Sequence, residues 1–263
     1  MTSLRFSLKG RRALVTGASS GIGRAVALGL AEHGAELILH HFGNEAGARE
    51  VAEMTGGKAP VIEADFTRQG ATEAFARHVL DQFGPIDILI ANAAIERRMP
   101  WNDIDEAHIA AHVASNFAAL LALTGRLIPP MVERGWGRVV ATGSIMATRP
   151  RTETIVYASL KAAQLTAVRA IARDVAPRGV TVNVVSPGAI EIEANAAQYS
   201  DPAFRRAVTA KIPAGRQGQP QDLAGAFVFL CSDAASYITG ANIPVDGGWS
   251  IGDAPGVLPQ VAD

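Results

Sequence analysis

Tyr157 and Lys161 lie four residues apart in the stretch IVYASLKAAQ, which covers residues 155–164. Positions i and i+4 fall on the same face of a helix, so the phenol and the ammonium would point together. Alanine and leucine fill most of the surrounding positions, which indicates that this face meets protein rather than bulk water. A phenol in a partly dry site can donate or accept a proton, and a neighbouring ammonium would favour its phenolate form. The same spacing also arises by chance, so the pair needs support from the elements around it.

The composition indicates one domain over residues 1–263. The hydrophobic fraction of 48% is ample for a core, and the net charge of -1 without a basic block argues against nucleic acid or an anionic membrane as a partner. The opening segment, MTSLRFSLKGRR, has no uninterrupted apolar stretch, and no later run reaches the roughly 18 apolar residues of a membrane span. We therefore expect a cytoplasmic protein. Its single cysteine, Cys231, lies in an apolar run and is expected to be a buried structural thiol.

Short aliphatic runs alternate with alanine-rich stretches of helical length. This order predicts a single-domain Rossmann-like α/β fold, a doubly wound parallel sheet of about seven strands with helices on both faces. The helix that carries Tyr157 is expected from about 153 to 176, ended by Pro177 and Gly179. Residues 250–263 are expected to form a C-terminal tail. The expected strands cover 13–16, 36–41, 60–64, 86–91, 138–142, 180–186 and 242–245.

A glycine-rich turn joins the first expected strand to the helix after it. In TGASSGIG, the residues Gly17, Gly21 and Gly23 would allow a tight turn and a close approach of backbone to a pyrophosphate at the helix N-terminus. A plain strand-to-helix turn is the alternative, but the position of the loop at the start of a βαβ series favours a dinucleotide. Ligands of such sheets lie across the carboxyl ends of the strands. Asp65, after the third strand, is therefore expected at the adenine, and Asn92, after the fourth, beside the ribose.

Seven sequence features occur in an order typical of one known family. They are TGASSGIG, ANAA (91–94), Asn116, GS (143–144), YASLK, SPG (186–188) and SYITGANIPVDGGW (236–249), and they span about Lys9 to Trp249. In this set the chain resembles the short-chain dehydrogenase/reductase family, most of all 3-oxoacyl carrier-protein reductases and glucose dehydrogenases. The resemblance implies a nicotinamide cofactor and a catalytic tetrad of Asn116, Ser144, Tyr157 and Lys161. The cofactor-binding residues expected from the loop and the resemblance are Gly17, Ser19, Ser20, Gly21, Ile22, Gly23, His41, Asp65, Phe66, Asn92, Ala93, Tyr157, Lys161, Pro187, Gly188 and Ile190.

Two positions depart from the family pattern. ANAA replaces the usual Asn-Asn-Ala-Gly, and Ile192 stands where many members have a threonine that bonds the nicotinamide amide. We therefore expect the backbone near Ile190 to carry that amide contact.

Each tetrad residue would have its own role in the transfer of a hydride and a proton. Tyr157 would be the general acid or base on the substrate oxygen, and Lys161 would favour its phenolate and bond the nicotinamide ribose. Ser144 would donate a hydrogen bond to the developing alkoxide, and Asn116 would anchor a water leading from Lys161 to solvent. Taken singly, Ser144 is better explained as a helix cap or turn residue and Asn116 as a satisfied core amide, but the four residues together favour the tetrad. The predicted function is an NAD(P)-dependent oxidoreductase that interconverts a secondary alcohol and a ketone; the alternative is a non-catalytic dinucleotide-binding regulator or sensor.

The end of the second strand bears on the choice of cofactor. NAD-specific sites usually place a carboxylate there, on the ribose hydroxyls, and the family pattern puts that position at His41. His41, with Ser20 and Asn44, would offer donors to a 2′-phosphate, although no arginine or lysine is present. NADP is therefore favoured over NAD, with use of both left open.

Other polar residues have simpler interpretations. His108 and His112 have a zinc-compatible spacing, but the glutamate of a metalloprotease motif and a third ligand are missing, so we expect a solvated helix face and no metal. Arginines after the fourth and fifth strands lie near the expected mouth of the site, where each could touch the substrate. They are Arg97, Arg98, Arg149 and Arg151.

The segment 189–216 follows the sixth strand without a strand of its own, and we expect it to be the substrate lid. Its Glu191 and Glu193, opposite Arg149 and Arg151, favour a polar substrate such as a sugar or hydroxy acid over a steroid. A homo-oligomer, most commonly a tetramer in this family, is expected because the helices near 104–133 and 153–176 are apolar around much of their circumference. The small residues concerned include Ala110, Ala114, Ala118, Ala162, Ala163 and Ala167.

Overall fold

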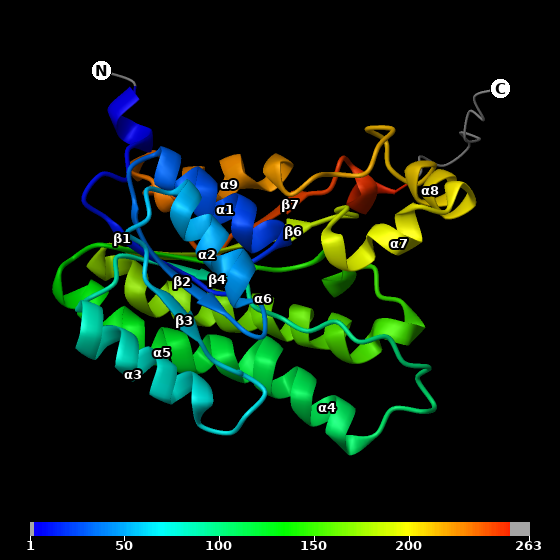
Figure 1. The fold of residues 1–263 in the computed structure, drawn as a ribbon, viewed down its shortest axis with the longest axis horizontal. Coiled ribbons are helices and arrows are strands. Elements are labelled where there is room, and N and C mark those ends of the chain that lie inside the picture. Colours follow the sequence, from blue (N-terminus) through cyan, green and yellow to red (C-terminus); the bar gives the residue numbers. More distant parts are fainter. Residues whose placement is uncertain (1–2, 253–263) are drawn as a thin grey trace.

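The computed structural model describes residues 3–252, in which one parallel sheet carries helices on both faces (Figure 1). The strand order is β3-β2-β1-β4-β5-β6-β7, so the winding reverses between the central strands β1 and β4. The predicted Rossmann-like, doubly wound fold is confirmed. The residues of the expected tail beyond 252 lie outside the described part. The strands are β1 Arg12–Val15, β2 Glu36–His41, β3 Val61–Glu63, β4 Ile88–Ala91, β5 Gly137–Thr142, β6 Val180–Pro187 and β7 Asn242–Val245.

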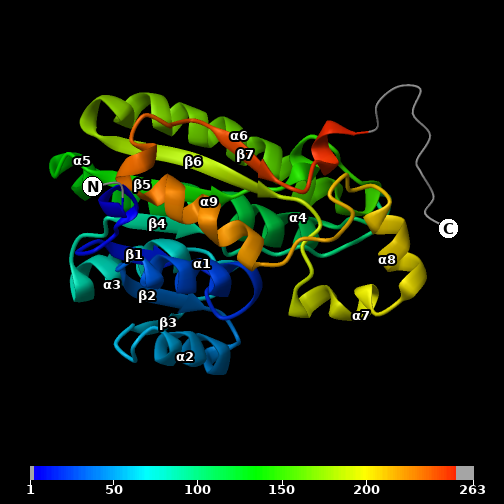
Figure 2. The same cartoon turned by 90° about the horizontal axis from the view of Figure 1, so that it is seen from above.

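Three helices pack on each face, because successive side chains of a strand point to opposite sides of the sheet. On one face Leu14 and Leu89 pack with α3, α5 and α6; on the other Val15 and Ile90 pack with α1, α2 and α9. The central strands β1, β4, β5 and β6 are consequently buried at nearly every position, as strands covered on both faces are. Figure 2 shows the two layers on either side of the sheet. The helices are α1 Gly21–Glu32, α2 Glu45–Met54, α3 Ala71–Phe83, α4 Glu106–Val113, α5 Ala119–Glu133, α6 Ile155–Val175, α7 Ala196–Tyr199, α8 Pro202–Thr209 and α9 Gln221–Cys231.

A π-helical turn over Ala114–Ala118 joins α4 and α5 into one helix, and such turns are frequent at functional sites. Within residues 3–252, Glu106–Glu133 is the single helix long and apolar enough by length and composition to span a membrane, and 44% of its most apolar window is buried inside the fold. The helix packs along the sheet, where Leu123 and Leu127 enter the core. Its other face carries the exposed side chain of Leu121.

The carboxyl ends of the strands meet at one edge of the sheet, where α7 and α8 lie beyond them (Figure 2). α6 ends at Val175, followed by Pro177 and a left-handed Gly179, close to its expected bounds. Cys231 at the end of α9 is fully buried, and burial raises the pKa of its thiol. The residues expected to do chemistry lie at or near the strand ends and on α6.

Candidate active site

The glycine loop is held by side chains from neighbouring strands. The Asn92 side-chain amide donates to the carbonyl oxygens of Thr16 and Gly17 at 3.0 and 3.2 Å, and the Thr142 hydroxyl donates to Asn92 Oδ1 at 3.0 Å. A Cβ on Gly23 would lie 2.0 Å from the Gly17 carbonyl oxygen, so only glycine lets α1 pack this closely on the loop.

The free N–H groups and the helix dipole at the N-terminus of α1 would attract a phosphate. Its N-cap, Ser20, makes no side-chain capping bond, and its hydroxyl is exposed. The Gly21 N–H donates to Oε2 of Glu193, in the segment after β6, at 3.2 Å. Ile192 packs against the same glycine. A carboxylate therefore occupies an anion position of the expected dinucleotide site.

Two buried histidines end β2. His40 accepts the Gly17 N–H at Nδ1 (3.1 Å) and bonds the Ala64 carbonyl through Nε2 (3.0 Å), and burial lowers its pKa to about 4. His41 is 3% exposed, and its Nδ1 has no partner in the described part of the chain. A buried nitrogen normally has a partner, so this one fits a hydroxyl or phosphate oxygen of a nucleotide.

Asp65 and Phe66 follow β3 with different orientations. Asp65 Oδ1 accepts from the backbone and hydroxyl of Thr67 at 2.9 and 2.6 Å, and these bonds lower the pKa of the carboxyl. The Phe66 ring is buried and stacks on His40 at 4.2 Å between centroids, so only its backbone is left to meet a cofactor. The aromatic ring exposed near this end is Phe42, at 61%, which the sequence patterns did not single out.

Ser144, Tyr157 and Lys161 come together between β5 and α6. Ser144 Oγ accepts the Met146 N–H at 3.1 Å as the cap of a short 3₁₀ turn, which leaves its hydroxyl proton free to donate elsewhere. Lys161 Nζ donates to the Thr142 carbonyl at 2.6 Å and lies 5.5 Å from the centroid of the Tyr157 ring. One helical turn on α6 thus places the ammonium beside the phenol, as the spacing indicated.

The expected shift of Tyr157 toward phenolate is wrong for this structure. Burial raises the pKa of the Tyr157 phenol, the Glu96 carboxylate raises it further, and the Ser144 hydroxyl lowers it. Burial lowers the pKa of Lys161 to about 8, against the opposite effect of Glu96. Desolvation disfavours the tyrosinate, so Tyr157 is in its acid form at neutral pH.

Asn116 lies in the π-helical turn, and both ends of its amide bond the backbone of Ile95, at 2.8 Å each. A cavity of about 10 Å³ is lined by Asn116, Lys161 and Gln164, about the size of one water. Gln164 Oε1 is buried there without a partner among residues 3–252. The cavity therefore has room and polar groups for a water beside Lys161.

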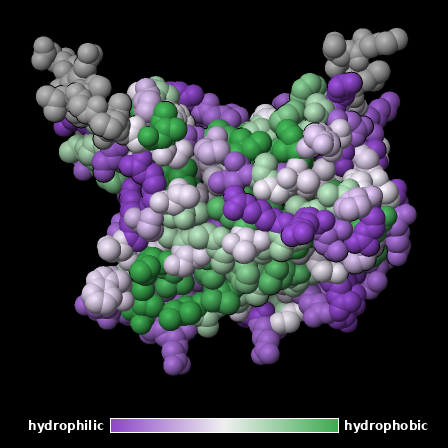
Figure 3. Space-filling view, turned by 180° about the vertical axis from the view of Figure 1, so that it is seen from behind, coloured by the Kyte–Doolittle hydropathy of each residue, from purple (hydrophilic) through white to green (hydrophobic). Residues whose placement is uncertain are grey.

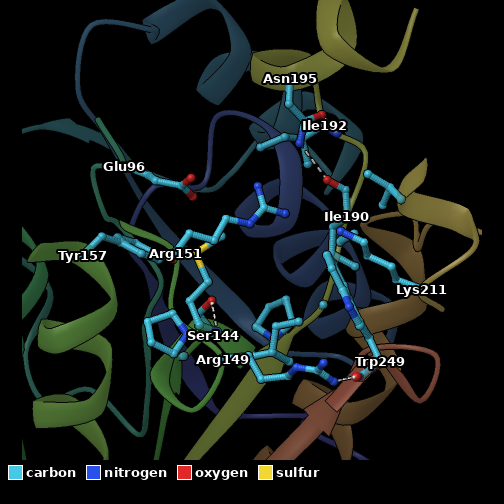
Figure 4. Close-up of a pocket in the computed structure, with 18 of the residues that line it drawn as sticks. Glu96, Ser144, Arg149, Arg151, Tyr157, Ile190, Ile192, Asn195, Lys211 and Trp249 are labelled. Carbon is cyan, nitrogen blue, oxygen red and sulfur yellow. Dashed lines mark hydrogen bonds between the residues drawn. The ribbon is translucent and has the colours of Figure 1, made fainter. Parts of the chain in front are cut away.

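A pocket of about 740 Å³ opens beside Tyr157 and Ser144. Figure 4 shows these two residues with Glu96 on one side, and Lys211 with Trp249 on the other. The segment after β6 contributes to the pocket lining Ile190, Ile192 and the side chains of Tyr199, Phe204 and Val208 from α7 and α8. Three further expected cofactor residues line the pocket: Ile22, Pro187 and Gly188. Ser19 and Ala93 do not line it. Ser19 lies in the glycine loop, and the Ala93 N–H donates to the Thr16 hydroxyl.

Only some of the charged residues expected near the mouth of the pocket line it. Arg98, Arg149 and Arg151 line the pocket, whereas Arg97 is not among the described residues that line it. Glu191 forms a bidentate pair with Arg205 and Glu193 bonds Gly21, so the expected opposition of these lid acids to Arg149 and Arg151 is wrong.

The expected solvated face of His108 and His112 is also wrong. The two residues are 7% and 0% exposed. His112 Nδ1 bonds the His108 carbonyl at 2.8 Å, and the Arg97 N–H donates to His112 Nε2 at 3.2 Å. Burial lowers the pKa of His112, which keeps it neutral and able to accept this bond.

Two pocket residues were missed, Glu96 and Lys211. Glu96 lies five residues beyond β4, where the carboxyl-end rule could have found it. Lys211 is one of four lysines and lies in the expected lid, but only the folded lid shows which way it points.

The comparisons with known proteins agree with this geometry. Residues 17–250 match a family described as Enoyl-(Acyl carrier protein) reductase. The 3-oxoacyl-[acyl-carrier-protein] reductase of Salmonella typhimurium is 37% identical over 250 residues, 92% of this chain and 98% of the relative. A gluconate 5-dehydrogenase of Burkholderia cenocepacia, solved with NADP and tartrate, superposes with a TM-score of 0.88 at 32% identity, over 95% of this chain and 99% of its own.

A 3-oxoacyl (acyl-carrier-protein) reductase of Agrobacterium tumefaciens, solved with NADP, also has a TM-score of 0.88, at 34% identity over 94% of this chain and 97% of its own. The resemblance stated from the sequence motifs is therefore confirmed. The chain belongs to the short-chain dehydrogenase/reductase family.

Proposed function

We propose that the protein is an NADP-dependent oxidoreductase that interconverts a polar secondary alcohol and the corresponding ketone. The observation that carries this proposal is the position of Ser144 and Tyr157 at the pocket beside the glycine loop, with Lys161 Nζ 5.5 Å from the Tyr157 ring centroid. The relatives named above are enzymes, which gives no support to a non-catalytic regulator.

The nicotinamide, when bound, supplies or accepts the hydride, and the residues of the chain handle the proton. In the direction of reduction, the Tyr157 O–H gives its proton to the substrate oxygen, and the Ser144 hydroxyl donates a hydrogen bond to the same oxygen. Lys161 stabilises the tyrosinate that is left behind. The small cavity with Asn116 and Gln164 gives Lys161 a route to recover a proton through water.

The glycine loop, Asp65, the backbone of 92–93 and residues 187–190 would hold the dinucleotide. NADP is favoured because β2 ends in His41 rather than a carboxylate, with an unpartnered Nδ1. The solved relatives with NADP bound support the same choice. The test is turnover of a panel of polar ketones, sugars and hydroxy acids with both cofactors; no turnover in any member, with cofactor bound, would refute the proposed activity.

We propose a cytoplasmic homotetramer without membrane or nucleic acid partners. Apolar side chains gather on the lower half of the face in Figure 3, the part of the molecule where Figure 1 places α4 and α5. Those helices expose Ile109, Val113 and Leu121. A monomeric mass at micromolar concentration, measured by light scattering, would refute the assembly.

The rate of ketone reduction should fall as the pH rises through about 8. Tyr157, whose pKa is raised, stays protonated across this range, but Lys161, whose pKa is lowered to about 8, loses the charge that stabilises the tyrosinate. Below the pKa of Lys161 the ammonium is fully present and the rate should reach a plateau. Glu96→Gln should shift the falling limb to lower pH, because Glu96 raises the pKa of Lys161. A profile of kcat/KM for reduction that stays flat to pH 10 would contradict this role.

Glu193→Gln should tighten NADP binding by about two- to fivefold. The Glu193 carboxylate bonds Gly21 N at 3.2 Å and competes with a pyrophosphate for the N-terminus of α1. An anion at a helix N-terminus is stabilised by about 0.3–1 kcal/mol, and removing the competing carboxylate should improve the free energy of NADP binding by a similar amount. The matched control is Glu191→Gln, whose carboxylate pairs with Arg205 instead. The measurement is the Kd by titration calorimetry; weaker binding in Glu193→Gln would show that the carboxylate holds the lid closed over the cofactor.

A further inference from the structure

His40 is a buried residue of β2 whose two ring nitrogens bond two different segments of the chain. Its side chain is within a residue that is 2% exposed. Its Nδ1 accepts the Gly17 N–H at 3.1 Å, and its Nε2 lies 3.0 Å from the Ala64 carbonyl oxygen. A carbonyl oxygen can only accept, so Nε2 carries the ring proton and the imidazole is neutral. Burial favours the same state, because it lowers the pKa of His40 to about 4.

The first of the two segments is the glycine loop, in which Gly17 is held at both of its backbone polar groups. His40 on β2 bonds the Gly17 N–H, and Asn92, which follows β4, donates its side-chain amide to the Gly17 carbonyl oxygen at 3.2 Å. The backbone carbonyl of His40 also accepts the Ala18 N–H at 2.9 Å. Because β1 lies between β2 and β4 in the sheet, the loop after β1 is held from both neighbouring strands.

The second segment follows β3 and carries Asp65. Both residues next to Asp65 contact the imidazole: the Ala64 carbonyl bonds Nε2, and the Phe66 ring stacks on His40 with centroids 4.2 Å apart and an angle of 4° between the planes. The Phe75 ring of α3 packs edge-on against the same imidazole at 5.0 Å. One buried ring therefore joins the Asp65 segment to the glycine loop.

We propose that His40 is a positioning residue of the dinucleotide site, which holds the pyrophosphate end and the adenine end at a fixed separation. This inference rests on the proposed function, in which the glycine loop takes the pyrophosphate and Asp65 the adenine. His40 is buried, so it acts through Gly17 and Ala64 and not by contact with the ligand. A ligand that spans both ends gains affinity from this tie, because it does not have to order the two segments when it binds.

The test measures the Kd of NADP, which spans both ends, and of adenosine 2′-monophosphate, which reaches only the adenine end, in the full-length protein. His40→Leu leaves the Gly17 N–H and the Ala64 carbonyl without this partner, so the Kd of NADP should rise about tenfold or more. The Kd of adenosine 2′-monophosphate should rise about twofold or less, because that ligand needs no fixed separation. His40→Asn keeps an acceptor near the position of Nδ1 and should bring the Kd of NADP to within about threefold of the wild type.

A merely structural role of His40 would not move the other two readouts. In His40→Leu the KM for NADPH should rise while kcat at saturating NADPH stays within about twofold, because the tetrad is unchanged. The nitrogen-15 spectrum of histidine-labelled wild type should show His40 neutral and protonated at Nε2. The matched control is Val79→Ala, since Val79 is fully buried in the core cluster that includes Phe66 and Phe75. Val79→Ala should lower the Tm and leave the Kd of NADP within about twofold.

An unchanged Kd of NADP in folded His40→Leu, an equal loss for both ligands, or a His40→Asn variant as weak as His40→Leu would overturn the inference. If His40→Leu does not fold, His40→Gln takes its place, because glutamine keeps a polar group near the position of Nε2 but loses the acceptor for Gly17. The expected losses of affinity in an enzyme that turns over no ketone would refute the proposed activity alone. Turnover of a ketone with wild-type affinity for NADP in folded His40→Leu would refute the inference alone.

Discussion

Tyr157→Phe should lower kcat by about 10² or more while leaving the Kd for NADP within about twofold. The substitution removes the phenol O–H that lies beside Ser144 and Lys161 and keeps the ring. The phenol is costly to ionise where it is buried, so its proton is held until the substrate oxygen can take it. The loss should therefore appear in the chemical step and hardly at all in cofactor binding.

The matched control is Tyr237→Phe, because Tyr237 is fully exposed and lies away from the pocket. Stopped-flow measurement of a single turnover, together with cofactor titration, separates the chemical step from binding and product release. Near-normal turnover in a folded Tyr157→Phe protein would show that another group carries the proton.

The fold was predictable from the sequence because the signals for it are local. Runs such as residues 36–41 and 242–245 match β2 and β7 residue for residue, since a short run with aliphatic residues between turn residues is a local signal for a strand. The reversal between β1 and β4 follows from winding right-handed crossovers on both faces. The short edge strand β3 was predicted two residues too long, because Pro60 and Ala64 each bond β2 through one backbone group but lie just outside the strand.

The candidate site was predictable only where a residue follows a strand or shares a helix face. Ser144, Tyr157 and Lys161 satisfy that condition, and the structure brings them together. Glu96 also follows a strand, β4, but the direction of its side chain and that of Lys211 depends on contacts between distant segments. The backbone next to Glu96 is held by the side-chain amide of Asn116, which bonds Ile95, and a sequence pattern cannot show this contact.

Charge and burial were the least predictable properties. His108 and His112 looked like a polar helix stripe, yet the loop after β4 covers them and uses one ring nitrogen as an acceptor. The pKa of Tyr157 was expected to fall beside Lys161, but desolvation acts on both groups and raises one pKa while it lowers the other. Both errors have one cause: burial is set by packing across the sheet, not by neighbours in sequence.

Gly23→Ala should weaken NADP binding by about 10² or more, although alanine is the better helix former by about 1 kcal/mol. The added Cβ would lie 2.0 Å from Gly17 O and 2.6 Å from Asn92 Nδ2, which is the atom that holds the loop. Because those atoms belong to backbone and to a bonded amide, α1 must move away from the loop. The N–H groups at its N-terminus would then no longer face the pyrophosphate.

Gly225→Ala is the matched control, since Gly225 lies in α9 and a Cβ there meets no atom within 4 Å. The Gly225→Ala variant should have a higher free energy of unfolding and an unchanged Kd for NADP. The Gly23→Ala variant should bind NADP more weakly even at temperatures where circular dichroism shows that this variant is folded. If Gly23→Ala unfolds, Gly23→Ser at low temperature and thermal shift with and without NADP decide between a folding defect and a binding defect. Unchanged affinity in a folded Gly23→Ala protein would mean that the close packing of α1 on the loop does not position the phosphate site.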